Sequence, residues 1–193
     1  MSEIKKKAFD NNNISGVFDI NIHSRISTGL PECENEDWKV LREFAEDGHP
    51  CNILHYKRNK GSRIMVDHYH WGYDRFLIYL TKFGNSISKI HMSGLGIGML
   101  IPVILSHRNI EKLNVVEVSC SLIDLIEPFY ESYTSSGRLK IQCFDAMKWD
   151  PDEGEHYDVA FHDIWYELNK EESISMLKRY IGFCDKQFCW CGT

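Results

Sequence analysis

The feature that most constrains the fold is a regular alternation of strand-forming and helix-forming segments from residue 88 onward. The expected strands cover residues 88–92, 113–118, 139–144, 157–162 and 187–191, and the expected helices cover 97–107, 121–133 and 170–182. Strands that alternate with helices of this length are typical of crossover connections and of a parallel sheet with helices on both faces. The sequence therefore predicts an α/β fold.

The segment before this alternation is expected to add a helix and a β-hairpin. Apolar residues in the segment 37–46 recur roughly with a helical period, which predicts a short amphipathic helix. The strand-forming segments 52–58 and 63–69 are separated by turn-forming residues and predict a hairpin. A second amphipathic helix is expected over 73–83.

Composition and charge narrow the class of protein. The chain has 193 residues, enough for one core, and a formal net charge of -6. Because proteins that neutralise nucleic-acid phosphates normally carry a clustered basic face, a small-molecule substrate fits this charge better than a nucleic acid. No apolar run approaches the roughly 18 residues that span a bilayer, and no signal peptide is recognisable. We therefore expect a cytoplasmic protein without a membrane segment.

The seven cysteines lack the spacing of a disulfide framework or of a zinc site. We expect them to be reduced thiols, as is usual in the cytosol. His68 and His70 are alternate residues of an expected strand and could share one face, but no third ligand is evident. We therefore expect no metal.

A glycine-rich turn follows the first strand of the alternation. Gly94, Gly96 and Gly98 stand between that strand and an amphipathic helix. Glycine permits a tight turn and lets a ligand approach the backbone, and a helix start offers free N–H groups. The same turn could equally serve packing alone.

Acidic residues follow the next three strands. Glu117 ends the second strand about 20 residues after the glycines, and Asp145 and Asp163 follow the third and the fourth. The carboxyl ends of parallel strands form the ligand crevice of an open sheet, and a carboxylate at the second strand can bind ribose hydroxyls. A single Asp after a strand is more often a cap or a turn residue, so the inference rests on all three.

Residues 88–165 resemble the class I S-adenosylmethionine-dependent methyltransferases. GLGIG resembles their first motif, VVEVS their acidic strand end, CFDAMKW their adenine-side motif and YDVAFHDIW their fourth motif. The resemblance implies a Rossmann-like domain over 87–193 that binds S-adenosylmethionine, preceded by a substrate-side extension over 1–86. It assigns cofactor contacts to Gly94, Gly96, Gly98, Glu117, Asp145 and Ala146, and it places Asp163 at the reacting centre.

Within that superfamily the chain is similar to the spermidine (polyamine) synthase branch and to small phage-type relatives. The hairpin, the segment MVDHYHWGYDRF and the segment YDVAFHDIW carry this likeness. It implies that Tyr73, Asp74 and His70 lie on the substrate side. Trp165 could stack on the substrate or pack in the core.

The chain departs from both families at the glycine turn. Met92 stands two positions before the first glycine, where methyltransferases commonly have an acidic residue, and Ile97 stands where polyamine synthases have Asp. The chain also stops after the expected fifth strand, so we expect a sheet truncated there. An uncovered edge with Phe188, Trp190 and Cys191 would favour association, so we expect a homo-oligomer.

Together these features favour methyl transfer from S-adenosylmethionine to a small acceptor, with an amine as one candidate. Asp163 would orient the acceptor or accept its proton, unless it only caps the following segment. Aminopropyl transfer from decarboxylated S-adenosylmethionine stays open, as do a noncatalytic binder and an enzyme that degrades S-adenosylmethionine. A dinucleotide-dependent oxidoreductase is less favoured, because GLGIGM lacks the third glycine of GxGxxG.

Overall fold

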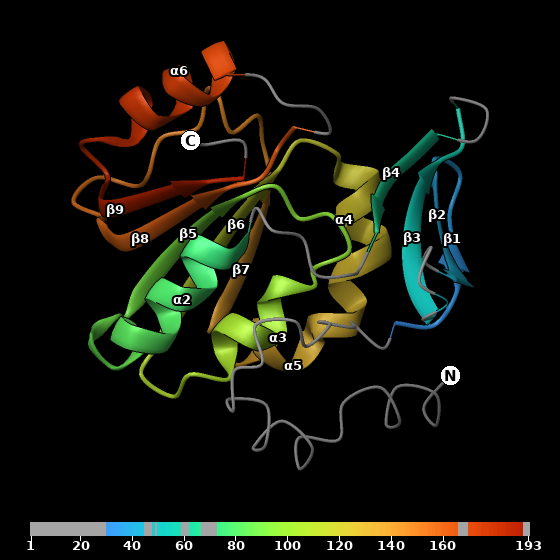
Figure 1. The fold of residues 1–193 in the computed structure, drawn as a ribbon, viewed down its shortest axis with the longest axis horizontal. Coiled ribbons are helices and arrows are strands. Elements are labelled where there is room, and N and C mark those ends of the chain that lie inside the picture. The colour runs from blue at the N-terminus through green and yellow to red at the C-terminus, as the bar shows by residue number, and fades with distance from the viewer. Residues whose placement is uncertain are drawn as a thin grey trace.

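The computed structural model describes residues 30–44, 48, 50–58, 62–66, 73–165 and 170–190, which form two sheets (Figure 1). The first sheet is antiparallel, with the order β1-β2-β3-β4. Its strands are β1 (Cys33–Glu34), β2 (Trp38–Phe44), β3 (Pro50–Tyr56) and β4 (Ser62–Val66). It lies beside α4 (Cys120–Ile126) in Figure 1.

The second sheet is parallel throughout and has the order β7-β6-β5-β8-β9. Its strands are β5 (Lys89–Ser93), β6 (Lys112–Glu117), β7 (Leu139–Cys143), β8 (Tyr157–His162) and β9 (Cys184–Cys189). Strand order reverses at β5, so β5 and β8 form the switch point where open sheets of this kind bind ligands. The predicted Rossmann-like α/β fold is confirmed.

Helices cover both faces of the parallel sheet. The remaining helices are α2 (Asp74–Phe83), α3 (Leu100–Leu105), α5 (Glu131–Ser135) and α6 (Lys170–Tyr180), with 3-10 turns η3 (Gly84–Ser86) and η4 (Glu127–Tyr130). The larger core cluster joins α2, α3 and α4 to one face, where Phe76 stacks on Phe161 at 4.7 Å between ring centroids. The smaller cluster packs α6 on the other face through Met176 and Tyr180. Burial on both faces explains the nearly continuous apolar strands.

The helix predicted over 37–46 is wrong, because this segment contains strand β2. All seven residues of β2 pair with β3, from Trp38 opposite Tyr56 to Phe44 opposite Pro50. The short sequence WKVLREF also fits a strand, since Trp, Val and Phe pack well on a pleated surface and Val40 is fully buried. Pairing with β3 satisfies the backbone along its whole length, and this non-local pairing overrides the weak helical period.

The predicted hairpin over 52–58 and 63–69 is present as β3 and β4, with earlier bounds. The strand predicted over 187–191 is β9, which begins three residues earlier. The aromatic ring of β9, Phe188, packs within the chain. Its centroid lies 5.9 Å from that of Phe76 and 5.2 Å from that of Tyr79. In the part of the chain that the structure describes, no helix combines the length and apolarity that crossing a membrane requires.

Candidate nucleotide site

The glycine turn between β5 and α3 has left-handed backbone at all three glycines. The φ angles of Gly94, Gly96 and Gly98 are 95°, 52° and 71°. A Cβ at Gly94 would collide with the carbonyl oxygen of Asp163, and a Cβ at Gly98 would lie 2.5 Å from the ring of Tyr130. Packing alone therefore requires glycine at these two positions.

Gly96 differs from its neighbours, because it is the one residue between positions 91 and 100 that is not buried. Of the three glycines, this is the one at which a ligand has access to the turn.

Glu117 ends β6 and is held by two backbone groups. Its Oε2 accepts a hydrogen bond from the N–H of Leu95 over 2.9 Å, and its Oε1 accepts one from the N–H of Ser119 over 2.9 Å. These bonds connect the glycine turn to the β6–α4 loop. A carboxylate has about four acceptor positions, so Glu117 keeps capacity for two hydroxyl donors.

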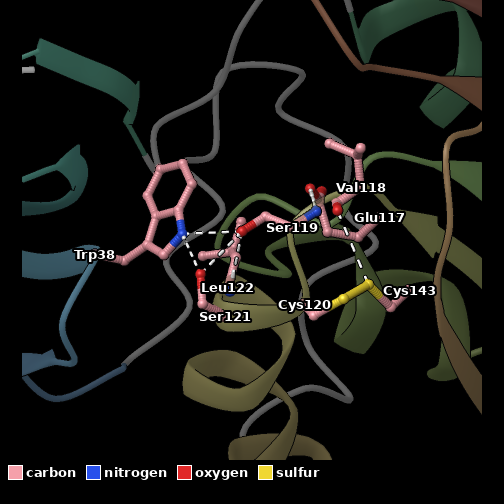
Figure 2. Close-up of a disulfide and its surroundings, with 8 residues drawn as sticks. All are labelled: Trp38, Glu117, Val118, Ser119, Cys120, Ser121, Leu122 and Cys143. Carbon is pink, nitrogen blue, oxygen red and sulfur yellow. Dashed lines mark hydrogen bonds between the residues drawn. A yellow bond between two sulfur atoms is a disulfide. The ribbon is translucent and has the colours of Figure 1, made fainter. Parts of the chain in front are cut away.

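The β6–α4 loop is also anchored to the antiparallel sheet, as Figure 2 shows. The indole N–H of Trp38 donates to the hydroxyl oxygens of Ser119 and Ser121, over 3.0 and 3.2 Å. The amide of Asn35 donates to the carbonyl oxygen of Ser121 over 2.6 Å. Ser119 in turn caps α4 by accepting from the N–H of Leu122 over 3.2 Å.

Cys120 and Cys143 form a disulfide beside this loop (Figure 2). The expectation that all cysteines are reduced thiols is therefore wrong for this pair. The two residues are 23 positions apart and lack any motif spacing, so only the pairing of β6 with β7 brings them together. Among the described cysteines, Cys33, Cys51, Cys184 and Cys189 lie outside this disulfide.

Asp145 follows β7 and stabilises its own turn. Its Oδ1 accepts from the N–H of Met147 over 2.9 Å, and its Oδ2 lies 3.0 Å from the ammonium of Lys148. The hydrogen bond from Lys148 lowers the pKa of Asp145. Ala146 is buried, and its carbonyl oxygen accepts from the hydroxyl of Tyr180 over 3.1 Å. Asp145 thus acts as a turn residue whose segment borders the same edge as Glu117.

Asp163 follows β8 and forms a hydrogen bond with Tyr73, the residue before α2. The hydroxyl of Tyr73 donates to Oδ2 of Asp163 over 2.8 Å. Burial raises the pKa of Asp163 to about 6, although the hydrogen bond from Tyr73 acts to lower it. Burial likewise raises the pKa of Tyr73. The pair therefore holds a carboxylate that can gain or lose a proton near neutral pH.

A chain of buried polar side chains crosses the sheet directly beneath these loops, and sequence reasoning missed it. Asn114 Nδ2 lies 3.2 Å from His91 Nδ1, and His91 Nε2 lies 3.1 Å from Ser93 Oγ. Ser93 Oγ lies 2.9 Å from His162 Nδ1, and His162 Nε2 lies 3.2 Å from Gln187 Oε1. The sequence signal for this hydrogen-bonded chain is the presence of polar residues at alternate positions of otherwise apolar strands.

Exposed apolar side chains also stand at the carboxyl edge and were missed. Val118, Phe144 and Ile164 come one or two residues after β6, β7 and β8, and their exposed fractions are 70%, 49% and 36%. Large apolar residues at the carboxyl ends of three strands of one sheet are unusual on a surface that meets only water. They provide a surface on which a flat, apolar ring can lie.

The remaining predicted substrate-side residues are placed differently or not described. The indole N–H of Trp165 donates to Oε2 of Glu172 over 2.7 Å, and its ring packs against the smaller core cluster. Asp74 opens α2, but its side chain lies outside the described part of the chain, as does all of His70. Cofactor and substrate roles for these residues stay predictions.

The arrangement brings residues distant in sequence to one edge of the sheet. Gly94 contacts the backbone of Asp163, whose N–H donates to the carbonyl oxygen of Ser93 over 2.8 Å. Leu95 joins Glu117, and the N–H of Phe144 donates to the carbonyl oxygen of Glu117 over 2.9 Å. Among the residues that the structure describes, no group of three or more His, Cys, Asp or Glu side chains could hold a metal ion. Carboxylates and a glycine turn that is partly exposed at Gly96 are the chemical elements of this site.

Comparison with known proteins shows the fold of the class I methyltransferases. A protein from Pyrococcus horikoshii assigned as an RNA methyltransferase superposes with a TM-score of 0.50 at 15% identity, over 67% of this chain and 64% of its own. Spermidine synthase from Thermotoga maritima gives a TM-score of 0.48 at 16% identity, over 70% and 48% of the two chains. Coclaurine N-methyltransferase, solved with N-methylheliamine and S-adenosylhomocysteine, gives 0.46 at 17% identity, over 60% and 33%.

This chain thus spans only a third to two-thirds of the length of these three proteins. It spans 43% of the CcbJ methyltransferase from Streptomyces caelestis. No protein-family profile and no curated protein sequence matches the chain. At such low identity, the likeness concerns the fold.

Proposed function

We propose that the chain is an S-adenosylmethionine-dependent transferase that alkylates a small acceptor, with methyl transfer to an amine as the first candidate. The single observation that carries this proposal is the Tyr73–Asp163 pair at the switch point of the sheet. It places a proton acceptor with a pKa of about 6 next to the glycine turn. An amine that forms a new bond to carbon must lose a proton, and a carboxylate of this kind can accept it.

The residues of the edge fit a sulfonium nucleoside. Besides its bonds to the N–H groups of Leu95 and Ser119, Glu117 has acceptor capacity left for the two ribose hydroxyls. Val118 and Phe144 offer an apolar surface for the adenine ring, at the ends of neighbouring strands. Gly96 leaves the backbone of the turn open to the ligand. The formal net charge of -6 also suits a ligand with a positively charged sulfur.

When bound, S-adenosylmethionine supplies an electrophilic carbon on a positively charged sulfur, so the protein has to supply mainly alignment. Tyr73 orients the carboxylate of Asp163 through its hydrogen bond. Asp163 then orients the acceptor nitrogen and takes its proton at Oδ1, the oxygen that does not accept from Tyr73. Met92 is buried and apolar, so it contributes no charge to the recognition of the amino-acid part.

Aminopropyl transfer from decarboxylated S-adenosylmethionine is the second candidate. The same pair supports it, because an amine acceptor loses its proton in this reaction as well. Binding preference between the two donors therefore decides between the reactions.

The test is calorimetric titration with S-adenosylmethionine, its decarboxylated form and S-adenosylhomocysteine. We expect binding of one ligand per chain, and Glu117→Gln should weaken it at least tenfold. Glu153→Gln is the matched control, because Glu153 is an exposed residue of the turn that precedes β8, at the opposite edge of the sheet. Preference for the decarboxylated donor would select aminopropyl transfer. Failure of all three ligands to bind at millimolar concentration would overturn the proposal.

We further propose that the chain associates through β9, which is the edge strand of the parallel sheet within the described residues. Edge strands are common sites of association between chains. Sedimentation at micromolar concentration should give at least a dimer, and a strictly monomeric protein would exclude this arrangement.

A further inference from the structure

We propose that the Cys120–Cys143 disulfide is a redox-sensitive clamp on the nucleotide site, and that the oxidised chain binds the nucleoside ligand more tightly than the reduced chain. The identity of the ligand rests on the function proposed above, whereas the clamp is inferred from the structure alone. Figure 2 shows the disulfide next to the loop that carries Glu117.

The disulfide joins the two segments that flank the proposed ribose and adenine contacts. Cys120 opens α4, directly after Ser119, whose N–H holds the carboxylate of Glu117. Cys143 is the last residue of β7, pairs with Glu117 across the sheet and is followed by Phe144. The sulfur of Cys143 also lies 3.9 Å from the carbonyl oxygen of Val118. The cross-link therefore bridges the mouth of the site rather than the core.

Both cysteines are exposed, whereas Cys51 and Cys184, which lie outside the disulfide, are buried. A reductant in solution can therefore reach the bond without unfolding the chain. Exposed disulfides are generally the labile and regulatory ones, and in reducing compartments disulfides are usually transient. The position and accessibility of this bond are those of a redox-sensing pair.

The chemical step is disulfide exchange with a dithiol. One thiolate of the dithiol attacks a sulfur of the pair, the Cys120–Cys143 bond breaks, and the second thiolate closes the dithiol into a cyclic disulfide. The dithiol loses two electrons and two protons, and the two cysteines gain them as thiols. Air or a low-molecular-weight disulfide reverses the step.

Opening the bond should loosen the two loops without dissolving the sheet. The N–H of Phe144 still donates to the carbonyl oxygen of Glu117, and Ser119 still caps α4. The cross-link adds preorganisation, because loops that are already ordered lose less conformational entropy when a ligand binds. The expected effect is therefore a graded loss of affinity and not an on-off response.

The first experiment measures the affinity for S-adenosylhomocysteine before and after reduction with dithiothreitol, with alkylation and mass analysis to count the new thiols. Reduction should weaken binding about fivefold. Cys143→Ser should have the affinity of the reduced chain under both conditions, and so should Cys120→Ser. Cys51→Ser is the control and should keep the full response to reductant. Equal affinities of the oxidised and reduced chains, or tighter binding by the reduced chain, would overturn the proposal.

The second experiment needs no ligand and follows amide hydrogen exchange in the two redox states. Amides of residues 118–122 and 144–146 should exchange several-fold faster after reduction, while those of β5 and β8 should not change. Unchanged exchange in both loops would overturn the clamp even if a ligand bound. Faster exchange in a chain that binds none of the nucleosides would retain the clamp and reject the proposed function.

Discussion

The indole N–H of Trp38 donates to the hydroxyl of Ser119 over 3.0 Å, across 81 positions of sequence. Ser119 is also the residue whose backbone N–H holds Glu117 and whose hydroxyl caps α4. Through this contact the antiparallel sheet supports the loop that carries the proposed ribose contact. The antiparallel sheet is thus a structural part of the proposed nucleotide site.

Trp38→Phe should weaken ligand binding with little effect on stability. Phe keeps a ring beside Tyr56, which lies 4.8 Å away between centroids, but it cannot donate to Ser119. Loss of one such hydrogen bond corresponds to about 1 kcal/mol, or roughly a fivefold loss of affinity. In a Glu117→Gln background the substitution should cause no further loss, since it acts through that carboxylate. Additive losses in a calorimetric double-mutant cycle would contradict this coupling, and the exposed Phe44 offers a neutral control as Phe44→Leu.

Gly96→Ala and Gly98→Ala should separate ligand binding from packing. At Gly96 a methyl group would be added to a residue with a left-handed φ of 52°, so we expect a stability loss of about 1 kcal/mol and a loss of affinity for S-adenosylhomocysteine of more than tenfold. At Gly98 the methyl group would press on Tyr130, and we expect about 2 to 3 kcal/mol of destabilisation. Urea unfolding and calorimetry on both variants provide the comparison. Unimpaired binding by a folded Gly96→Ala variant would place the ligand elsewhere.

The rate of transfer should rise with pH through about 6, because Asp163 must be ionised to accept a proton. Asp163→Asn should lower the rate at least a hundredfold and remove this rise. Tyr73→Phe should move the midpoint of the rise to higher pH by about one unit, because the hydrogen bond from Tyr73 lowers the pKa of Asp163. A pH–rate profile of each variant with saturating donor gives the answer. An unshifted midpoint in Tyr73→Phe would remove Asp163 from the reaction.

Asp163→Asn should at the same time stabilise the fold above pH 6. The carboxyl has a pKa of about 6 in the folded chain and about 3.9 when unfolded, so the folded chain binds more protons between these values. The free energy of unfolding therefore falls as the pH rises from 4 to 6 and stays lower above it. Removing the carboxyl should recover on the order of 3 kcal/mol at pH 7.5. Urea unfolding at pH 4 and pH 7.5 tests this, since the gain must be confined to the higher pH.

The buried histidines should act on stability in the opposite direction. Burial lowers the pKa of His162 to about 4 and that of His91 well below its ordinary value, whereas unfolded histidine titrates near 6.5. The unfolded chain thus binds more protons between pH 6.5 and 4, so stability falls as the solution is acidified across this range. His162→Gln should reduce the pH slope by up to one proton, whatever its effect on stability at pH 7. An identical slope would show that His162 is charged in the folded chain.

Much of the fold could be predicted from local patterns. The apolar strands and the helices between them recur with periods of two and 3.6 residues, which depend on neighbouring residues alone. The segment 37–46 shows where this fails, because WKVLREF is compatible with both periods over so short a length. Its pairing with β3 decided the outcome. The Cys120–Cys143 bond was missed for the same reason, since sequence spacing does not reveal which strands are neighbours.

By itself, the sequence determined the class of fold, the glycine turn and the order of the acidic residues, because each depends on residues close together in the chain. The tertiary structure alone decided which of these residues meet. It brought Tyr73 to Asp163 across 90 positions, left Gly96 partly exposed while burying its neighbours, and buried His91 and His162 in one hydrogen-bonded chain. Such contacts depend on strand order and on packing between distant segments, and burial then shifts the pKa values on which the proposed chemistry depends.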